Sequence, residues 1–264
     1  MIRIKTLLIY LIIFCLITIL NEVYALNGTT WYKDGRSIAL GGGMNAIEQT
    51  ESSGIAINYS LPYNLKELST RSMKFTYKPK WLGMEGFWSQ TGNVVFMENY
   101  FAFGASRHLT ESFILGVKGG YYHYSSINGT KGSIWLAEIL CSYRLSEKIQ
   151  VSIYLFNPTG ATINQSENSI PMDQSFHFGM SYYPVKKTEL LVEIEKHQKT
   201  PLIGHLGIET SIWESFILRA GLSSKPFCPS WGIGGKIHRF TYALGGTIHP
   251  VLGFSSCFSI QYIW

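Results

Sequence analysis

Three glutamates lie close together in one short segment of the chain, at Glu189, Glu193 and Glu195. Side chains alternate between the two faces of a β-strand, so residues an even number of positions apart share one face. The three carboxylates could therefore bind a cation together, or they could pair with lysine and arginine on neighbouring strands. Because an unpaired charge in a water-excluded space is costly, the sequence favours pairing and predicts no metal site.

Catalytic groups are harder to assemble from this chain. Beyond residue 25 there are only two aspartates, Asp34 and Asp173, and neither is expected beside a histidine or serine at an inward mid-strand position. His177, Ser181 and His249 could lie at the rim of a barrel, where outer-membrane phospholipases and proteases place their catalytic groups. No nucleophile motif surrounds them. The sequence therefore predicts no catalytic residues and no enzyme.

Other binding motifs are equally weak. The glycine-rich run 232–236 superficially resembles a phosphate-binding loop, but it lacks the required spacing and the following Ser or Thr. Mid-strand glycines more often relieve crowding in a barrel wall. The cysteines Cys141, Cys228 and Cys257 are scattered, which indicates neither a disulfide framework nor a zinc site. A formal net charge of +5 is too mild and dispersed to indicate nucleic acid binding. No cofactor is predicted.

The N-terminus has the order of a secretory signal. Arg3 and Lys5 precede an apolar run, 7–20, and small residues at 23–25 offer a cleavage point. We predict that residues 1–25 form a signal peptide that is removed. The alternative is an uncleaved anchor helix, since the run approaches the roughly 20 residues that span a bilayer. Lipidation at Cys15 is not expected, because Phe14 occupies a position that needs a small residue.

The composition of the remaining chain fits a wall that faces lipid. The sequence is 46% hydrophobic and 14% aromatic but only 15% charged, whereas soluble domains carry about 25% charged residues. From Ile55 onward the chain repeats about fourteen units, each an alternating run followed by a turn. The predicted strands are 55–60, 72–78, 83–91, 94–106, 113–124, 133–144, 148–156, 174–183, 187–196, 203–212, 215–223, 230–238, 240–249 and 254–264.

The last of these segments, 254–264, is the most informative. Phe254, Phe258, Ile260, Tyr262 and Trp264 share one face, and mostly polar residues occupy the other. A strand of this kind that ends on an aromatic residue is similar to the closing-strand signal of outer-membrane β-barrels, here carried by Phe258, Tyr262 and Trp264.

The fold prediction is therefore all-β: a transmembrane antiparallel β-barrel of about 14 strands with a short N-terminal hatch segment. Residues 26–54 form the predicted hatch, or plug, and residues 55–264 form the barrel. Connections after even-numbered strands are short, as expected for the periplasmic side. The longest connection, 157–173, follows the seventh strand, and 61–70, 125–132 and 225–229 are also predicted to lie outside the cell.

Strand parity divides the side chains into two sets. A soluble all-β sandwich would also alternate, but here one set is nearly free of charge, and its outward members include 73/75/77, 101/103, 135/137/139, 149/151/153/155, 176/178/180/182 and 190/192/194. The ionisable residues predicted to point inward are Lys74, Lys78, Glu85, Glu98, Lys118, Glu138, Arg144, Lys148, His177, Glu189, Glu193, Glu195, His205, Glu209, Arg219, Lys236 and His238. The two signs are balanced, which suits a lumen crossed by paired charges rather than an ion-selective pore. Arg36 of the hatch is expected to meet an inward carboxylate, with Glu193 the best candidate.

Several short motifs resemble one family of barrels. They are GRSIALGGGMNA at 35–46, KELS at 66–69, FNPT at 156–159, EIEK at 193–196, LRAG at 218–221 and HPVLG at 249–253. Their order and spacing resemble FadL-like barrels and the related PorV/PorQ-type proteins of type IX secretion. The resemblance implies a fourteen-stranded barrel whose N-terminal segment folds into the lumen. The segment 48–54 departs from the family pattern, which has an Asn-Pro-Ala-Gly stretch there, so the hatch is expected to be trimmed.

Three functions remain open for such a barrel in the cell outer membrane. It could be a channel for small hydrophobic or amphipathic molecules, gated by the N-terminal segment; a PorV/PorQ-like accessory barrel for type IX secretion or surface attachment; or a non-conducting structural barrel. The expected partners are outer-membrane lipid, the barrel-assembly machinery, and either hydrophobic small molecules or secretion-system proteins. A secretion partner would need exposed apolar loop residues. The candidates are Pro226, Phe227 and Pro229 beside Cys228, with Ile163, Ile170 and Met172 in the long loop.

Overall fold

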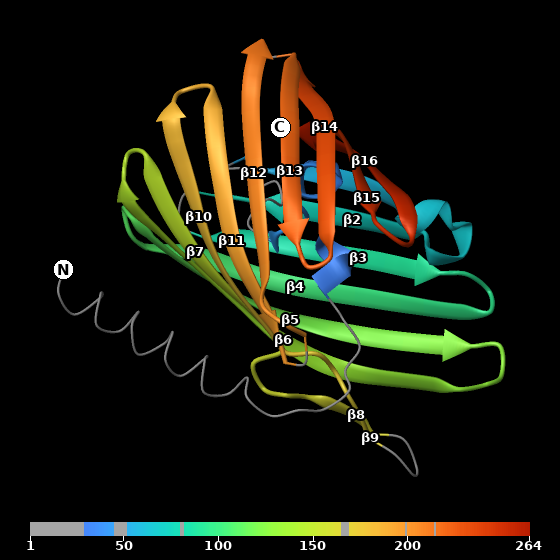
Figure 1. The fold of residues 1–264 in the computed structure, drawn as a ribbon. Helices are drawn as coiled ribbons and strands as arrows, with labels where there is room; N and C mark the ends of the chain where they lie inside the picture. The colour runs from blue at the N-terminus through green and yellow to red at the C-terminus, as the bar shows by residue number, and fades with distance from the viewer. Residues whose placement is uncertain (1–28, 45–51, 80–81, 165–168, 199, 214) are drawn as a thin grey trace.

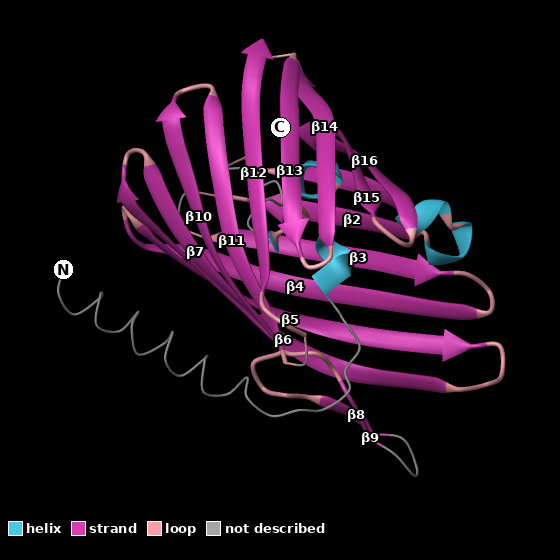
Figure 2. Cartoon of the chain, viewed as in Figure 1, coloured by secondary structure: helices cyan, strands magenta, loops and turns pink. Residues whose placement is uncertain are grey.

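The chain folds into a closed, antiparallel barrel of fourteen strands (Figure 1), which confirms the predicted fold class. The structure, a computed structural model, describes residues 29–44, 52–79, 82–164, 169–198, 200–213 and 215–264. The predicted signal peptide, 1–25, and the hatch residues 26–28 and 45–51 lie outside the described residues. Strands dominate the rest of the chain (Figure 2).

The barrel strands are β1 (Gly54–Leu61), β2 (Thr70–Tyr77), β3 (Gly83–Gly92), β4 (Phe96–Thr110), β5 (Phe113–Ser126), β6 (Lys131–Ser146), β7 (Ile149–Phe156), β10 (Ser175–Val185), β11 (Thr188–His197), β12 (Ile203–Trp213), β13 (Phe216–Ser224), β14 (Phe227–Ile237), β15 (Phe240–His249) and β16 (Gly253–Ile263). The other elements are the helical turns η1 (Thr29–Tyr32), η3 (Pro62–Asn64) and η4 (Lys66–Leu68), the short helix α2 (Gly35–Ala39), and a hairpin of β8 (Thr162–Asn164) and β9 (Ser169–Pro171). In the described part of the chain, no helix has the length and apolar character needed to cross a membrane.

Every barrel strand pairs with its neighbours in chain order, except that β7 pairs with β10 and β1 closes the barrel on β16. We call the end of the barrel where β1 begins and β16 finishes the terminal end, and the opposite end the loop end. Short connections lie at the terminal end and the long ones at the loop end, as the parity argument predicted.

Two predicted loops differ from the structure. The connection predicted at 225–229 is much shorter, because β14 already begins at Phe227 and continues the β13 ladder through Pro229. The long connection 157–173 is not an open loop, since it contains the β8–β9 hairpin. Its residues Ile163 and Met172 are each only 1% exposed and join the aromatic core of the lumen. The long connection therefore covers part of the lumen and does not present these side chains to a partner.

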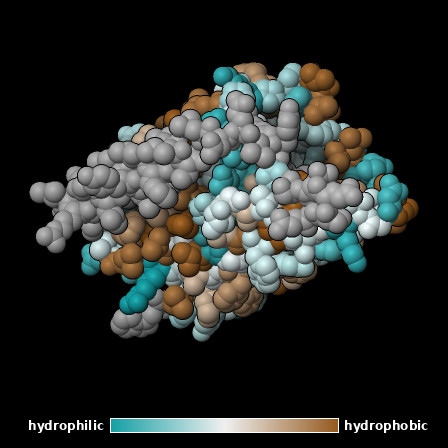
Figure 3. Space-filling view, turned by 90° about the horizontal axis from the view of Figure 1, so that it is seen from below, coloured by the Kyte–Doolittle hydropathy of each residue, from teal (hydrophilic) through white to brown (hydrophobic). Residues whose placement is uncertain are grey.

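The two faces of the wall separate as the alternation predicted. Outward side chains such as Phe103 and Trp135 are 64% and 73% exposed, whereas inward Ser89 and Cys257 are each 1% exposed. One outward group, Cys141 with Ile153, Leu155 and Phe176, packs into a buried cluster on the outer wall instead. Hydrophobic residues are prominent on the flanks of the molecule in Figure 3.

The C-terminal strand closes the barrel as predicted. The Trp264 amide donates a hydrogen bond to the Ser53 carbonyl oxygen at 3.1 Å, and its ring lies 6.0 Å from the rings of Phe75 and Tyr262. We expect Trp264→Asp, or deletion of 262–264, to block assembly, because this strand must supply the β1 edge with its partner. Heat-modifiable, protease-resistant protein in outer membranes is the measurement. Recovery at the wild-type level would contradict the prediction.

The register gives a second test. Val192 on β11 points outward and is 39% exposed, whereas Ser181, paired with Leu191, points inward. Because the outer wall is predicted to face lipid, Val192→Lys should cost about 2 to 4 kcal/mol near the midplane. Ser181→Lys should cost less. Urea unfolding in lipid bilayers measures both, and the opposite order would mean a register error of one residue.

Candidate functional site

The N-terminal segment 29–44 lies inside the barrel, where α2 packs mainly against β14, β15 and β16. Asp34 caps this short helix: its carboxylate accepts the Ser37 amide hydrogen at 2.7 Å, and the Ser37 hydroxyl oxygen accepts the Asp34 amide hydrogen at 3.0 Å. Such a capping box satisfies amide groups that a helix start leaves without partners. The cap lets a five-residue helix hold its shape in the lumen.

Glycines in the wall make room for this segment. A Cβ atom added to Gly221 would stand 2.4 Å from the Leu40 carbonyl carbon, and one added to Gly245 would stand 2.2 Å from the Gly35 oxygen. Any side chain at these positions would collide with the hatch backbone. Gly232, within the glycine-rich run, faces Ala39 in the same way. The run thus lies within strand β14, and Gly232 relieves crowding there, as expected.

Arg36 of the hatch reaches two wall carboxylates. Its Nη2 lies 2.8 Å from Glu189 Oε2 and its Nε lies 2.8 Å from Glu209 Oε2. Arg219 Nε also contacts Glu209 Oε2, at 2.6 Å. The predicted pairing of Arg36 with Glu193 is wrong, because the later hatch residue Met44 covers that carboxylate and donates its amide hydrogen to Glu193 Oε1 at 3.0 Å.

Histidines contact the other two glutamates directly. His177 Nδ1 lies 2.9 Å from Glu193 Oε1, and His205 Nε2 lies 2.7 Å from Glu195 Oε2. His197 contacts Glu195 through one ring nitrogen and Asp173 through the other. Asp173 stands outside the strands, as expected, but it does have a histidine neighbour. Asp173 sits just before β10, at the end of the long connection, where strand parity says nothing about side-chain direction.

The opposite side of the lumen is aromatic. Trp31 of η1 stacks on Tyr100 and Tyr122 with centroid distances of 4.6 and 4.9 Å, and Tyr32 stacks on Phe87 at 4.4 Å. The residues predicted to point inward were chosen among charged residues and histidines alone, so the prediction did not include this aromatic cluster. The same period-two parity that places Glu98 and Lys118 inward also places Tyr100 and Tyr122 there, and would have found it.

Glu138 anchors the aromatic cluster to the wall. Its carboxylate accepts hydrogen bonds from the hydroxyls of Tyr32, Tyr100 and Tyr154, the last at 2.9 Å. Burial, with the neighbouring Glu138 carboxylate, holds the pKa of Tyr32 well above its usual range, so its hydroxyl stays a hydrogen-bond donor. The bonds satisfy a carboxylate that is only 1% exposed.

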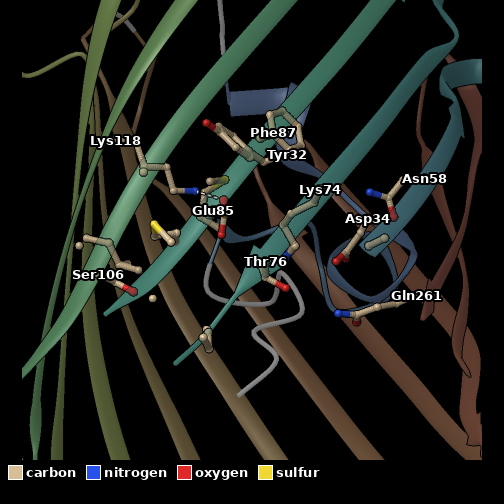
Figure 4. Close-up of a pocket in the computed structure, with 18 of the residues that line it drawn as sticks. Tyr32, Asp34, Asn58, Lys74, Thr76, Glu85, Phe87, Ser106, Lys118 and Gln261 are labelled. Atoms are coloured by element: carbon tan, nitrogen blue, oxygen red, sulfur yellow. Dashed lines mark hydrogen bonds and ion pairs between the residues drawn. The ribbon is translucent and has the colours of Figure 1, made fainter. Parts of the chain in front are cut away.

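Below the cluster, toward the terminal end, lies a cavity of about 170 Å³ (Figure 4). Its lining combines apolar side chains, such as Met44, Phe87 and Leu140, with polar and charged ones from several strands. Lys118 pairs with Glu85 at 2.5 Å and lies 4.8 Å from the centre of the Tyr32 ring. Figure 4 shows Lys74 and Lys118 reaching into the same space. An apolar cavity of about 150 Å³ holds benzene in another protein, so a small ring fits here by volume.

Six of the seven predicted lumen residues thus take part in contacts inside the barrel, in three separate groups. Arg36, Glu189 and Arg219 form one ionic group, Glu193 and Glu195 belong to the histidine cluster, and Glu138 holds the aromatic cluster. Lys236 does not join them, because it stands near the end of β14, where its side chain is exposed.

Solved structures with the same barrel are channels and transporters. The P. putida toluene transporter TodX matches with a TM-score of 0.65 at 9% identity, over 89% of this chain and 99% of that chain. The CymD monoaromatic hydrocarbon channel matches with a TM-score of 0.62 at 11% identity, over 88% and 97%. The Ralstonia pickettii toluene transporter TbuX matches with a TM-score of 0.58 at 9% identity, over 92% and 96%. No family model and no curated protein sequence matches the chain.

These likenesses define the class of fold. The chain has the barrel fold of these channels, with fourteen strands and an N-terminal segment in the lumen, as the resemblance to FadL-like barrels predicted. The resemblance to PorV/PorQ-type proteins stays a prediction.

The ionic group gives a test of how the hatch is held. Removing Arg36 leaves Glu189 and Glu209 partly buried without it, and breaking such a pair from one side costs about 3 to 5 kcal/mol. We expect Arg36→Ala to loosen the segment, seen as protease cleavage between 29 and 44 and as higher single-channel conductance in planar bilayers. Arg107→Ala, an exposed position on β4, is the control. Equal conductance in all three proteins would mean that packing against the glycines holds the segment unaided.

Proposed function

We propose that this protein is an outer-membrane channel for small hydrophobic molecules, closed by its N-terminal segment. The observation that carries the proposal is the cavity of about 170 Å³ that the hatch and wall enclose together. Met44 and Tyr32 of the hatch form part of its lining, so displacement of the hatch would open it. Its lining mixes hydrophobic side chains with polar and charged ones, and small-molecule sites combine hydrophobic walls with polar groups that fix orientation.

The fold supports the same function. The similar structures are described as monoaromatic hydrocarbon channels or toluene transporters, and the match spans nearly their whole length. We extend to this chain their class of cargo, a small apolar molecule, and their setting in a membrane. The exposed apolar outer wall supports the membrane setting, since contiguous exposed apolar surface of this size needs a partner or lipid.

The secretion-accessory alternative is less well supported. Of the loop residues it would use, Ile163 and Met172 are buried in the aromatic cluster and Ile170 packs against it. Phe227 is 63% exposed, but it belongs to a barrel strand. A purely structural barrel would not require a cavity lined by both the hatch and the wall, so the cavity does not support this alternative.

Filling the cavity tests the proposed function. Gly116 lines it, and the nearest atoms to an added Cβ would be Ser106 Cβ at 3.4 Å, Leu140 Cβ at 3.6 Å and the Ala105 oxygen at 3.7 Å, which are ordinary contacts. We expect Gly116→Phe to lower the uptake of labelled toluene by cells expressing the protein several-fold, because the ring would occupy the space. The matched control is Gly119→Phe on the same strand, which faces outward with nothing within 4 Å. Equal uptake by both variants, at equal amounts of folded protein, would contradict the proposal.

A further inference from the structure

The hatch contacts only part of a larger buried group of ionisable side chains, which we call the histidine cluster. Six side chains take part: His177, His197, His205, Glu193, Glu195 and Asp173. All are less than 7% exposed, and His177 is fully buried. They come from three adjacent strands and the long connection, so the barrel fold itself brings them together.

We propose that His177, Glu193 and Glu195 bind one divalent transition-metal ion of the zinc class. Each residue offers a ligand atom, and the three atoms lie within 4.8 Å of one another. A small inward movement of these side chains would bring all three to the distances of about 2.0 to 2.2 Å that zinc takes from histidine and carboxylate ligands. A mixed set of imidazole and carboxylate suits zinc, cobalt or nickel, whereas calcium and magnesium prefer oxygen ligands alone.

Neighbouring groups orient each ligand. Ser175 Oγ lies 3.0 Å from His177 Nε2 and can accept its hydrogen. Nδ1, which now faces Glu193 Oε1 at 2.9 Å, would then present its lone pair to the ion. His197 and His205 contact the two oxygens of Glu195. Metal sites commonly fix their ligands by such outer hydrogen bonds. A carboxylate oxygen has more than one lone pair, so Glu195 can keep these contacts and still bind.

The charges of the cluster favour a cation. Asp173, Glu193 and Glu195 bring three carboxylates into one buried space. Without an ion, both ring nitrogens of His197 face carboxylates, and those of His205 face Glu195 and the Gly41 carbonyl oxygen, so these rings carry a hydrogen on each nitrogen. A divalent ion would replace these protons as the partner of the carboxylates. The competing arrangement has no ion and carries protons on the imidazoles instead.

The site is also tied to the hatch. Glu193 Oε1 accepts the Met44 amide hydrogen at 3.0 Å, and His205 Nδ1 lies 2.7 Å from the Gly41 oxygen. An ion held by Glu193 would therefore fix a side chain on which the hatch rests. Metal binding should stabilise the folded chain, since a ligand that binds only the native state raises its stability.

The experiment counts metal on the full-length protein. The protein is extracted in detergent, stripped with chelator and dialysed against Zn²⁺ or Co²⁺, and the bound metal is measured by mass spectrometry. We expect one ion per chain, a visible ligand-field spectrum with Co²⁺, and a higher unfolding temperature with Zn²⁺. Glu193→Gln and His177→Gln should lose all three effects.

Matched controls separate the site from general binding. Glu98→Gln changes another lumen carboxylate, one that accepts a hydrogen bond from Tyr122, and His249→Gln changes a histidine near the loop end. Both should retain the ion. Wild-type protein that keeps no metal and shows no Co²⁺ spectrum would overturn the proposal in favour of the proton-only arrangement, even if a site variant failed to fold. Equal metal loss or equal retention across all four variants would also overturn it.

Discussion

Pairing between β1 and β16 closes the sheet, and closure determines the surroundings of every side chain in the barrel. An open edge would leave a row of backbone groups without partners, which a lipid environment cannot satisfy. Once the sheet is closed, alternate residues are committed to an enclosed face and an outer face. The enclosed space must then be filled by polar groups that satisfy one another, by apolar packing, or by a segment from elsewhere in the chain.

This lumen uses all three solutions, on different sides of the barrel. Strands β3, β4, β5 and β7 contribute aromatic side chains, and β6 contributes Ile134 and Leu136, which pack around Trp31 and Tyr32. Strands β10 to β13 contribute the carboxylates, histidines and Arg219. The hatch spans the two sides: η1 supplies the rings for the first, and Arg36 and the amide of Met44 supply partners for the second. Glycines on β12 to β15 complete the arrangement by letting the hatch backbone approach the wall.

Much of this could be predicted from the sequence because β-structure has a simple period. A single parity fixed the outward set around Met73 and Trp135 and the inward set around Glu138 and Glu193, and the fourteen strands followed from the turns between them. The aromatic cluster was within reach of the same rule, since Tyr100 and Tyr122 share a face with charged residues. The partners of the hatch were not, because Arg36 lies outside any strand and its reach depends on the three-dimensional path of the chain. The contact of Asp173 with His197 could not be predicted for the same reason, because Asp173 also lies outside the strands.

The division of the lumen has a consequence for passage through it. A small apolar molecule would pass on the aromatic side, where aromatic and aliphatic side chains offer it apolar contacts beside the Lys118–Glu85 ion pair. The charged side offers such a molecule nothing, and its buried ion pairs would be costly to separate. The charged side is therefore suited to holding the hatch in place, and the aromatic side is suited to the passage of an apolar molecule. Arg36 and Met44 hold the hatch on the charged side, and Trp31 and Tyr32 pack on the aromatic side. The hatch can therefore move away from the aromatic side while its contacts on the charged side remain. This movement would open the cavity beneath Tyr32 without breaking the ion pairs of Arg36 with Glu189 and Glu209.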